Sequence, residues 1–170
     1  MSDGASTPPL TVRVQREAVD VAAETDLLTR GRTDVGAVVT FTGLCRSEGG
    51  ELAALELEHY PGMAEAEIER TARAAIERWP LLGLTAIHRH GRIEPGEPIV
   101  LVITTSSHRV AAFEAAEYLM DFLKTRAPFW KKEEKRDGTS GAWVDARDHD
   151  DSAAARWENC DRARTGFGRS

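Results

Sequence analysis

The chain has 170 residues, of which 41% are hydrophobic, and it carries a formal net charge of -6. This composition supports one substantial apolar core, so the sequence predicts a single domain and excludes a disordered chain. The acidic balance excludes general nucleic-acid binding, and no apolar run approaches the roughly 20 residues of a membrane-spanning helix.

Cysteine usage and the N-terminal sequence indicate the compartment. Cys45 and Cys160 are far apart in the sequence and lack metal-ligand spacing, which is typical of a protein in a reducing environment. The first residues also lack the basic and apolar regions of a secretory signal. We therefore expect a cytoplasmic protein.

Hydrophobic periodicity and turn residues predict a mixed α+β fold. In chain order we expect strands at 10–14, 37–42, 55–59, 84–93, 99–105, 129–134 and 142–146, and helices at 20–30, 62–79 and about 107–126, with a helical piece at 153–157. These elements form one domain at 10–157, and we expect flexible ends at 1–9 and 158–170.

Three of these elements carry more detailed expectations. The alternating strand 55–59 favours a hairpin with strand 37–42. The apolar strand 99–105 reads as buried on both faces, and Ser106 or Ser107 can cap the helix that follows it. We expect that helix to bury a stripe of four residues, namely Phe113, Ala116, Met120 and Leu123.

The stretch 120–132 is the strongest candidate for a site. Pro128 ends the preceding helix, so Lys124 lies in its last turn and Lys131 lies on the next strand. The segment 104–132 has a net charge of +2 in an acidic chain, which indicates a small anionic ligand. Cations near a helix C-terminus are also common without any function, since they meet the negative end of the helix dipole.

His108 and Arg109 open the same helix. Free backbone amides at a helix N-terminus bind anions, and a histidine and an arginine strengthen that preference. A solvated helix cap is the alternative interpretation.

Two further groups have chemical potential but a simpler interpretation. His88 and His90 lie on one side of a strand, as two metal ligands would, yet no third ligand stands at a recognised spacing, so a structural role is favoured. Cys45 beside Arg46 could be a thiolate nucleophile, although a lone cysteine after a strand is more often inert.

At the level of longer motifs, the sequence resembles the large, catalytic subunit of molybdopterin synthase (the MoaE family). The resemblance extends from about Val12 to Trp157, and its motifs are 37–43 with Arg46, 57–63, 78–80, 87–89, 107–109, 120–131 and 143–147. The run from Met120 to Lys131 is the longest and most specific of them.

The resemblance implies an α/β hammerhead fold with an antiparallel β subdomain. It also implies a homodimer within a heterotetramer, in which a small ubiquitin-like sulfur carrier binds at each end. The carrier's C-terminal Gly-Gly thiocarboxylate supplies two sulfurs in turn to cyclic pyranopterin monophosphate, which becomes the dithiolene of molybdopterin. No metal or cofactor is implied for the chain itself.

The family's functional positions map onto six basic residues of this sequence. Lys124 and Lys131 would be catalytic, while substrate binding would fall to Arg46, His108, Arg109 and, from the other subunit, Arg147. Leu44 stands where the family usually has a lysine, and the segment after Trp157 lies beyond the resemblance.

Two other functions stay open at this point. One is a Cys45-dependent thiol transferase, and the other is a non-catalytic adaptor that binds a ubiquitin-like tail.

Overall fold

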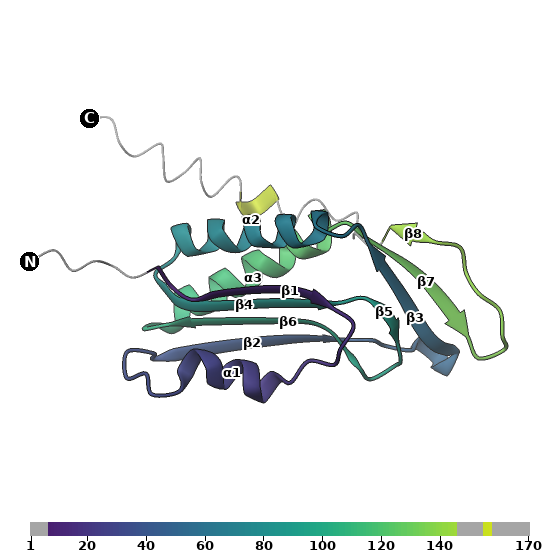
Figure 1. Ribbon diagram of the computed structural model, residues 1–170, viewed down its shortest axis with the longest axis horizontal. Helices are drawn as coiled ribbons and strands as arrows, with labels where there is room; N and C mark the ends of the chain where they lie inside the picture. The colour runs from purple at the N-terminus through teal and green to yellow at the C-terminus, as the bar shows by residue number, and fades with distance from the viewer. Residues whose placement is uncertain (1–6, 146–154, 158–170) are drawn as a thin grey trace, which may run out of the picture.

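The computed structural model describes residues 7–145 and 155–157. It contains a four-stranded sheet with helices on both faces and a second four-stranded sheet beyond one end of the first (Figure 1). The elements are β1 (Leu10–Gln15), α1 (Val21–Thr29), β2 (Ala37–Leu44), the 3-10 turn η1 (Glu48–Gly50), β3 (Leu52–His59), α2 (Met63–Arg78), β4 (Leu81–Arg89), β5 (Gly91–Ile93), β6 (Pro98–Ser106), α3 (Arg109–Arg126), β7 (Phe129–Lys135) and β8 (Val144–Asp145).

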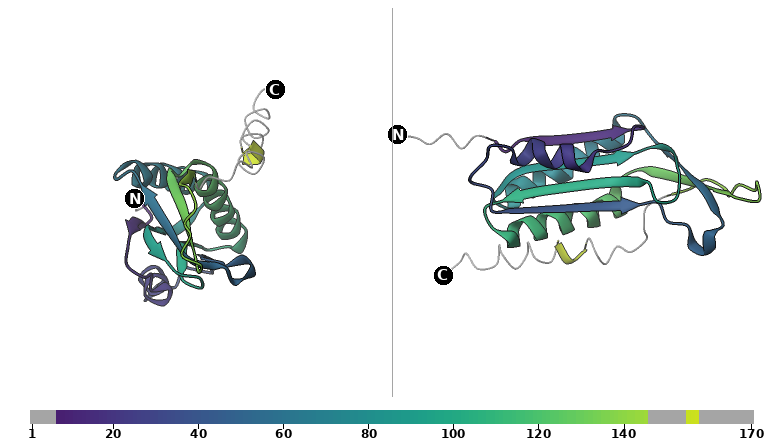
Figure 2. Two further views of the ribbon diagram at one scale, coloured as in Figure 1. Left: turned by 90° about the vertical axis from the view of Figure 1, so that its right-hand side faces the viewer. Right: turned by 90° about the horizontal axis from the view of Figure 1, so that it is seen from below.

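The first sheet has the strand order β1-β4-β6-β2 and is mixed. β1 runs parallel to β4, whereas β6 is antiparallel to both of its neighbours. α2 and α3 cover one face and α1 covers the other, as the view from below in Figure 2 also shows. The sheet therefore lies between two layers of helix, and β6 is buried on both faces as expected.

The main core lies between this sheet and the pair α2 and α3, and a smaller one lies under α1. α3 packs closely on β6, because the Thr104 hydroxyl on the strand donates to the Ala112 carbonyl of the helix at 2.7 Å. Small residues make this approach possible, and four alanines of α3 are buried. Phe113, which we expected in the buried stripe, is instead 61% exposed.

The second sheet is antiparallel, with the order β5-β3-β7-β8. The expected hairpin between strands 37–42 and 55–59 is wrong, because β2 gives its hydrogen bonds to β6 and β3 pairs with β5 and β7. The expected single strand 84–93 is also interrupted after Arg89, and Gly91 adopts a φ of 85° as the chain passes from the first sheet to the second. The hairpin of β7 and β8 is confirmed.

The structure is thus the α+β domain with an antiparallel β subdomain that we expected. Most of the predicted flexible ends, 1–9 and 158–170, lie outside the described residues. Residues 155–157 are helical, and Trp157 packs edge-on against Trp79 with ring centroids 5.6 Å apart. None of the helices in the described part of the chain is long and apolar enough to cross a membrane.

Candidate active site

The two sheets meet at a cleft beside the C-terminal end of α3. Its wider, polar part has a volume of about 630 Å³ and is lined by Leu44, Cys45, Arg46, Glu48, Glu51, Leu52, Leu55, Ile99, Lys124, Lys131, Glu133 and Lys135. Its narrower, apolar part has a volume of about 360 Å³ and is lined by Phe41, Gly43, Leu44, Leu55, Leu57, His88, Ile99, Val100, Met120, Leu123, Lys124, Ala127, Phe129 and Lys131. Both lysines of the sequence motif line both parts.

Lys124 reaches the cleft because of where α3 ends. Pro128 cannot continue the helix, and the last backbone hydrogen bond of the helix is donated by Ala127 N to the Leu123 oxygen at 3.3 Å. Leu123 is buried in the core, whereas the neighbouring Lys124 side chain is exposed. The last turn of α3 therefore presents an ammonium group at the junction of the two parts.

Lys131 reaches the same junction through the alternation of β7. Lys131, Glu133 and Lys135 line the cleft, two residues apart, as the strand period requires. Lys132 points to the opposite face, where its ammonium lies 5.0 Å from the centre of the Trp143 ring. Only the odd-numbered cations of this strand can therefore contact a ligand in the cleft.

Arg46 enters the polar part from the end of β2. Its side chain is exposed and forms an ion pair with Glu48. The backbone beside it is held by two hydrogen bonds to the turn before β6, in which Cys45 N donates to the Glu97 oxygen at 2.8 Å and Gly96 N donates to the Cys45 oxygen at 2.7 Å. The strand end is therefore fixed while the guanidinium stays accessible.

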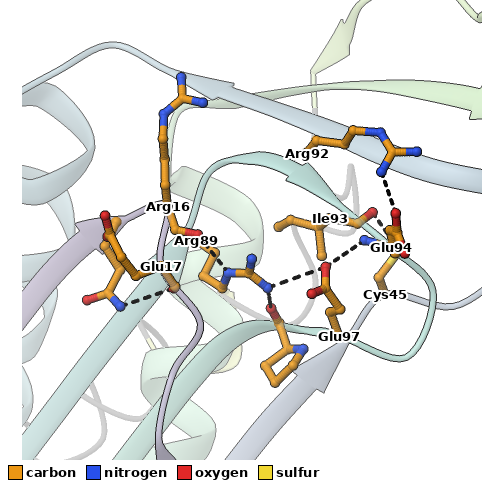
Figure 3. Close-up of polar contacts among 10 residues, drawn as sticks. Arg16, Glu17, Cys45, Arg89, Arg92, Ile93, Glu94 and Glu97 are labelled. Carbon is orange, nitrogen blue, oxygen red and sulfur yellow. Dashed lines mark hydrogen bonds and ion pairs between the residues drawn. The ribbon is translucent and has the colours of Figure 1, made fainter.

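A buried arginine supports this turn (Figure 3). Arg89 donates to the Arg16 carbonyl at 3.2 Å and to the Pro98 carbonyl at 3.0 Å, and its guanidinium lies 3.7 Å from the Glu97 carboxylate. The same carboxylate accepts the Glu94 amide at 2.8 Å. Arg89 thereby joins the ends of β1 and β4 to the turn that holds Cys45.

Cys45 itself is not placed as a nucleophile. The residue is 4% exposed, and its thiol lies 3.8 Å from the Ile93 carbonyl oxygen. Burial raises the pKa of the Cys45 thiol, and the carboxylates of Glu97 and Glu133 raise it further. The thiolate that the sequence hypothesis needs is therefore disfavoured.

The polar part of the cleft combines four cations with three carboxylates. Two of these carboxylates are engaged by cations, since Glu48 pairs with Arg46 and Glu51 lies 3.9 Å from the Lys135 ammonium. Lys131 has no ion pair within residues 7–145 and 155–157. Lys131 therefore brings positive charge that is available to an anion to the lysine junction.

His108 and Arg109 are not part of this cleft. They stand at the N-terminal end of α3, and 15 residues of helix separate Arg109 from Lys124, a rise of about 22 Å. Figure 1 shows α3 running along the first sheet toward the second. Within one chain the structure brings together Arg46, Lys124 and Lys131 and leaves this pair apart, while Arg147 lies outside the described residues.

His88 and His90, the two histidines considered as metal ligands, pack against different aromatic rings. His88 stacks on Phe129 with ring centroids 3.8 Å apart, and His90 lies against His59. Among the described residues, no group of three or more histidine, cysteine, aspartate or glutamate side chains has the arrangement of a metal site.

Sequence reasoning missed Phe41 and Glu133, and it gave His88 a structural role and placed Met120 in the buried stripe of the helix, whereas all four residues line the cleft. The period of β7 could have identified Glu133, because it lies two residues from Lys131. Phe41 and His88 come from strands whose orientation depends on pairing between distant segments, so no local signal places either of them in the cleft.

Comparison with known proteins gives the family of the chain. Residues 14–126 match the family described as MoaE protein. The molybdopterin synthase catalytic subunit of Mesorhizobium japonicum is 67% identical over 149 residues, which cover 88% of this chain and 94% of that protein. The subunit of the same name from Brucella melitensis is 60% identical over 156 residues, covering 92% and 96%.

A solved structure supports the fold independently of the described cleft. The molybdopterin biosynthesis MoaE protein of Burkholderia ambifaria superimposes with a TM-score of 0.77 at 46% identity, covering 88% of this chain and 98% of that one. Both the match of residues 14–126 and the identity to curated relatives extend over most of the chain. The chain belongs to the MoaE family.

Proposed function

We propose that the chain is the catalytic subunit of a molybdopterin synthase, the function for which its relatives are named. As a sulfurtransferase, it moves two sulfurs from the thiocarboxylated C-terminus of a small ubiquitin-like carrier to cyclic pyranopterin monophosphate and so makes the molybdopterin dithiolene. The observation that carries this proposal is the position of Lys124 and Lys131, which line both the polar and the apolar part of one cleft.

The charges of the reactants explain why lysines suit this position. The carrier's thiocarboxylate and the substrate's phosphate are both anions, and they repel each other by several kcal/mol in a partly dry site unless cations separate them. Water then cleaves the carbon–sulfur bond to the carrier, which leaves as a carboxylate, and the cyclic phosphate opens, so negative charge develops further. Lys124 and Lys131 stabilise that charge, and an ammonium also donates the proton that a leaving oxygen needs.

The polar part and the apolar part of the cleft suit different parts of the two reactants. The wide polar part, with Arg46 at its edge, suits the extended anionic tail of the carrier and the substrate's phosphate. The apolar part, with Phe41 and Phe129, suits a flat ring system. Lys124 and Lys131 then stand where the thiocarboxylate meets the reacting carbon.

His108 and Arg109 join this site from a second copy of the chain. β2 is an edge strand, and exposed apolar side chains lie on it and on α3, namely Val38, Phe41, Val110 and Phe113. A two-fold symmetric pair that covers these residues sets the two α3 helices antiparallel, with the N-terminal end of one beside the C-terminal end of the other. The proposed assembly is this homodimer with one carrier at each end, and Arg147 is expected to reach in from the partner as well.

Mixing two inactive variants tests the shared site. Lys124→Ala and Arg109→Ala each remove one half of every site in their own homodimers. A mixed dimer regains one intact site, so random exchange of equal amounts restores about a quarter of wild-type product formation. If His108 and Arg109 act in the same chain as Lys124, the mixture stays inactive and the shared site is refuted.

Two rival functions give different results in the same assay of purified chain, thiocarboxylated carrier and cyclic pyranopterin monophosphate. A Cys45-dependent thiol transferase loses activity in Cys45→Ala and keeps it in Lys124→Ala, and the burial of Cys45 argues against it. A non-catalytic adaptor binds the carrier and yields no dithiolene. We also propose that the reaction takes place in the cytoplasm.

A further inference from the structure

His88 is a residue of the apolar part of the cleft to which the proposed mechanism gives no task. It is the second-last residue of β4, and its ring stacks on Phe129 at an interplanar angle of 19°. Its Nδ1 lies 2.8 Å from the Arg89 carbonyl oxygen. Because a carbonyl oxygen only accepts hydrogen bonds, Nδ1 carries the hydrogen and donates it.

The other ring nitrogen of His88 is consequently an acceptor. Burial, together with smaller contributions from the nearby His59 and His90, lowers the pKa of His88 to about 4, so the imidazole is neutral at pH 7. A neutral ring with its hydrogen on Nδ1 has a lone pair on Nε2. Within the described residues Nε2 has no hydrogen-bond partner, and the side chain lines the cavity.

The other side chains that line this part of the cleft determine what the lone pair on Nε2 can bind. Nearly all of the lining side chains are apolar, and the exceptions are His88, Lys124 and Lys131. An ammonium group has donors but no acceptor. A ligand N–H that enters this part of the cleft therefore has one side-chain acceptor, and a buried N–H without an acceptor is costly.

We propose that Nε2 of His88 accepts a hydrogen bond from a ring N–H of a flat nitrogen heterocycle bound in the apolar part of the cleft, and that it thereby selects the ring that the site accepts. This inference rests on the proposed function, in which the pyranopterin is that heterocycle. Two aromatic side chains, Phe41 and Phe129, flank the volume of about 360 Å³, which favours a ring over the extended tail of the carrier.

The experiment measures binding of cyclic pyranopterin monophosphate to the full chain by calorimetry, in the absence of carrier. His88→Phe keeps a ring against Phe129 but has no acceptor, so its Kd rises by about tenfold to a hundredfold. His88→Gln places an amide oxygen near the position of Nε2 and stays within about fivefold of wild type. Should His88→Phe fail to fold, His88→Leu gives the same loss of the acceptor.

Two controls separate this role from a general disturbance of the cleft. His90→Phe changes the neighbouring histidine, which does not line the cavity, and leaves the Kd unchanged. Inorganic phosphate as a probe binds wild type and His88→Phe equally, because it has no ring.

The inference is overturned if His88→Phe binds the heterocycle as wild type does, or if His88→Gln is as weak as His88→Phe. It is also overturned if His88→Phe weakens binding of the carrier and leaves binding of the heterocycle unchanged, since the cavity then holds the carrier's tail. Dithiolene formation by the wild-type chain tests the proposed function separately. If the wild-type chain forms dithiolene and His88→Phe binds the heterocycle as wild type does, only the assignment of His88 is refuted.

Discussion

Replacing Lys124 by alanine is the sharpest test of the cleft. A charge 4 Å from an anion contributes about 4 kcal/mol at an effective dielectric constant of about 20. Lys124 is exposed in the free chain, so screening by solvent reduces the expected effect to about 3 kcal/mol, which corresponds to a rate loss of more than a hundredfold. Lys124→Arg keeps the charge and retains part of the rate.

Dithiolene formation in single turnover, with carrier and substrate both saturating, measures this loss without the binding steps. Lys132→Ala is the matched control, because Lys132 is a neighbouring cation of Lys131 that lies on the opposite face of β7 against Trp143. The reasoning is refuted if Lys124→Ala keeps more than a third of the wild-type rate, or if Lys132→Ala loses as much as Lys124→Ala does.

Three further predictions follow from burial and packing. Cys45→Ala keeps dithiolene formation within about threefold of wild type because its thiol is buried with a raised pKa, and a loss of turnover would reinstate the thiol mechanism. The pKa of His88 is about 4 in the folded chain and about 6.5 in the unfolded chain, so the unfolded chain binds the proton first as the pH falls, and the folded state loses stability. Between pH 7 and pH 5, the free energy of unfolding measured by urea denaturation should therefore fall by about 1 to 2 kcal/mol more in wild type than in His88→Gln. Equal decreases would contradict this. Gly36→Ala places a Cβ 2.3 Å from the Ser107 carbonyl oxygen and lowers the free energy of unfolding by about 2 kcal/mol, whereas an unchanged denaturation midpoint would contradict the close contact.

Local sequence signals predicted the elements that depend on neighbouring residues. The end of α3 follows from Pro128, the two-sided burial of β6 follows from its apolar run, and the β7–β8 hairpin follows from its turn residues. Each of these is determined within about ten residues of chain. Short-range signals of the same kind placed Lys124 in the last turn of α3 and Lys131 on β7.

The expectations that were wrong depended on partners far away in sequence. Strand 55–59 alternates as a hairpin strand does, but its partners β5 and β7 lie about 35 and 75 residues further along the chain. The expected stripe of α3 is confirmed at Ala116 and Leu123 and wrong at Phe113, because the close packing on β6 favours alanines and leaves Phe113 at the surface. Phe113 is one of the four exposed apolar side chains that the proposed dimer would cover.

Local signals placed only the two lysines of the candidate site together, whereas Arg46, which lies far from them in sequence, was expected from the family resemblance. Lys124 and Lys131 are close in the chain, and the structure places them together. His108 belongs to the same helix as Lys124 but lies at its far end, because an α-helix of 18 residues keeps its termini apart. Under the proposed function, His108 and Lys124 share one site only if the N-terminal end of α3 comes from a second copy of the chain.

The two lysines lie on elements that are joined by a short connection. Two residues, Ala127 and Pro128, separate the end of α3 from the start of β7, and both α3 and β7 are fixed by packing, since Leu123 and Phe129 are buried. A shift of β7 by one residue would turn Lys131 away and bring Trp130 or Lys132 to the cleft. The spacing of seven residues between Lys124 and Lys131 is therefore set by the helix end and the strand period together, which bring both side chains to the same junction of the cleft.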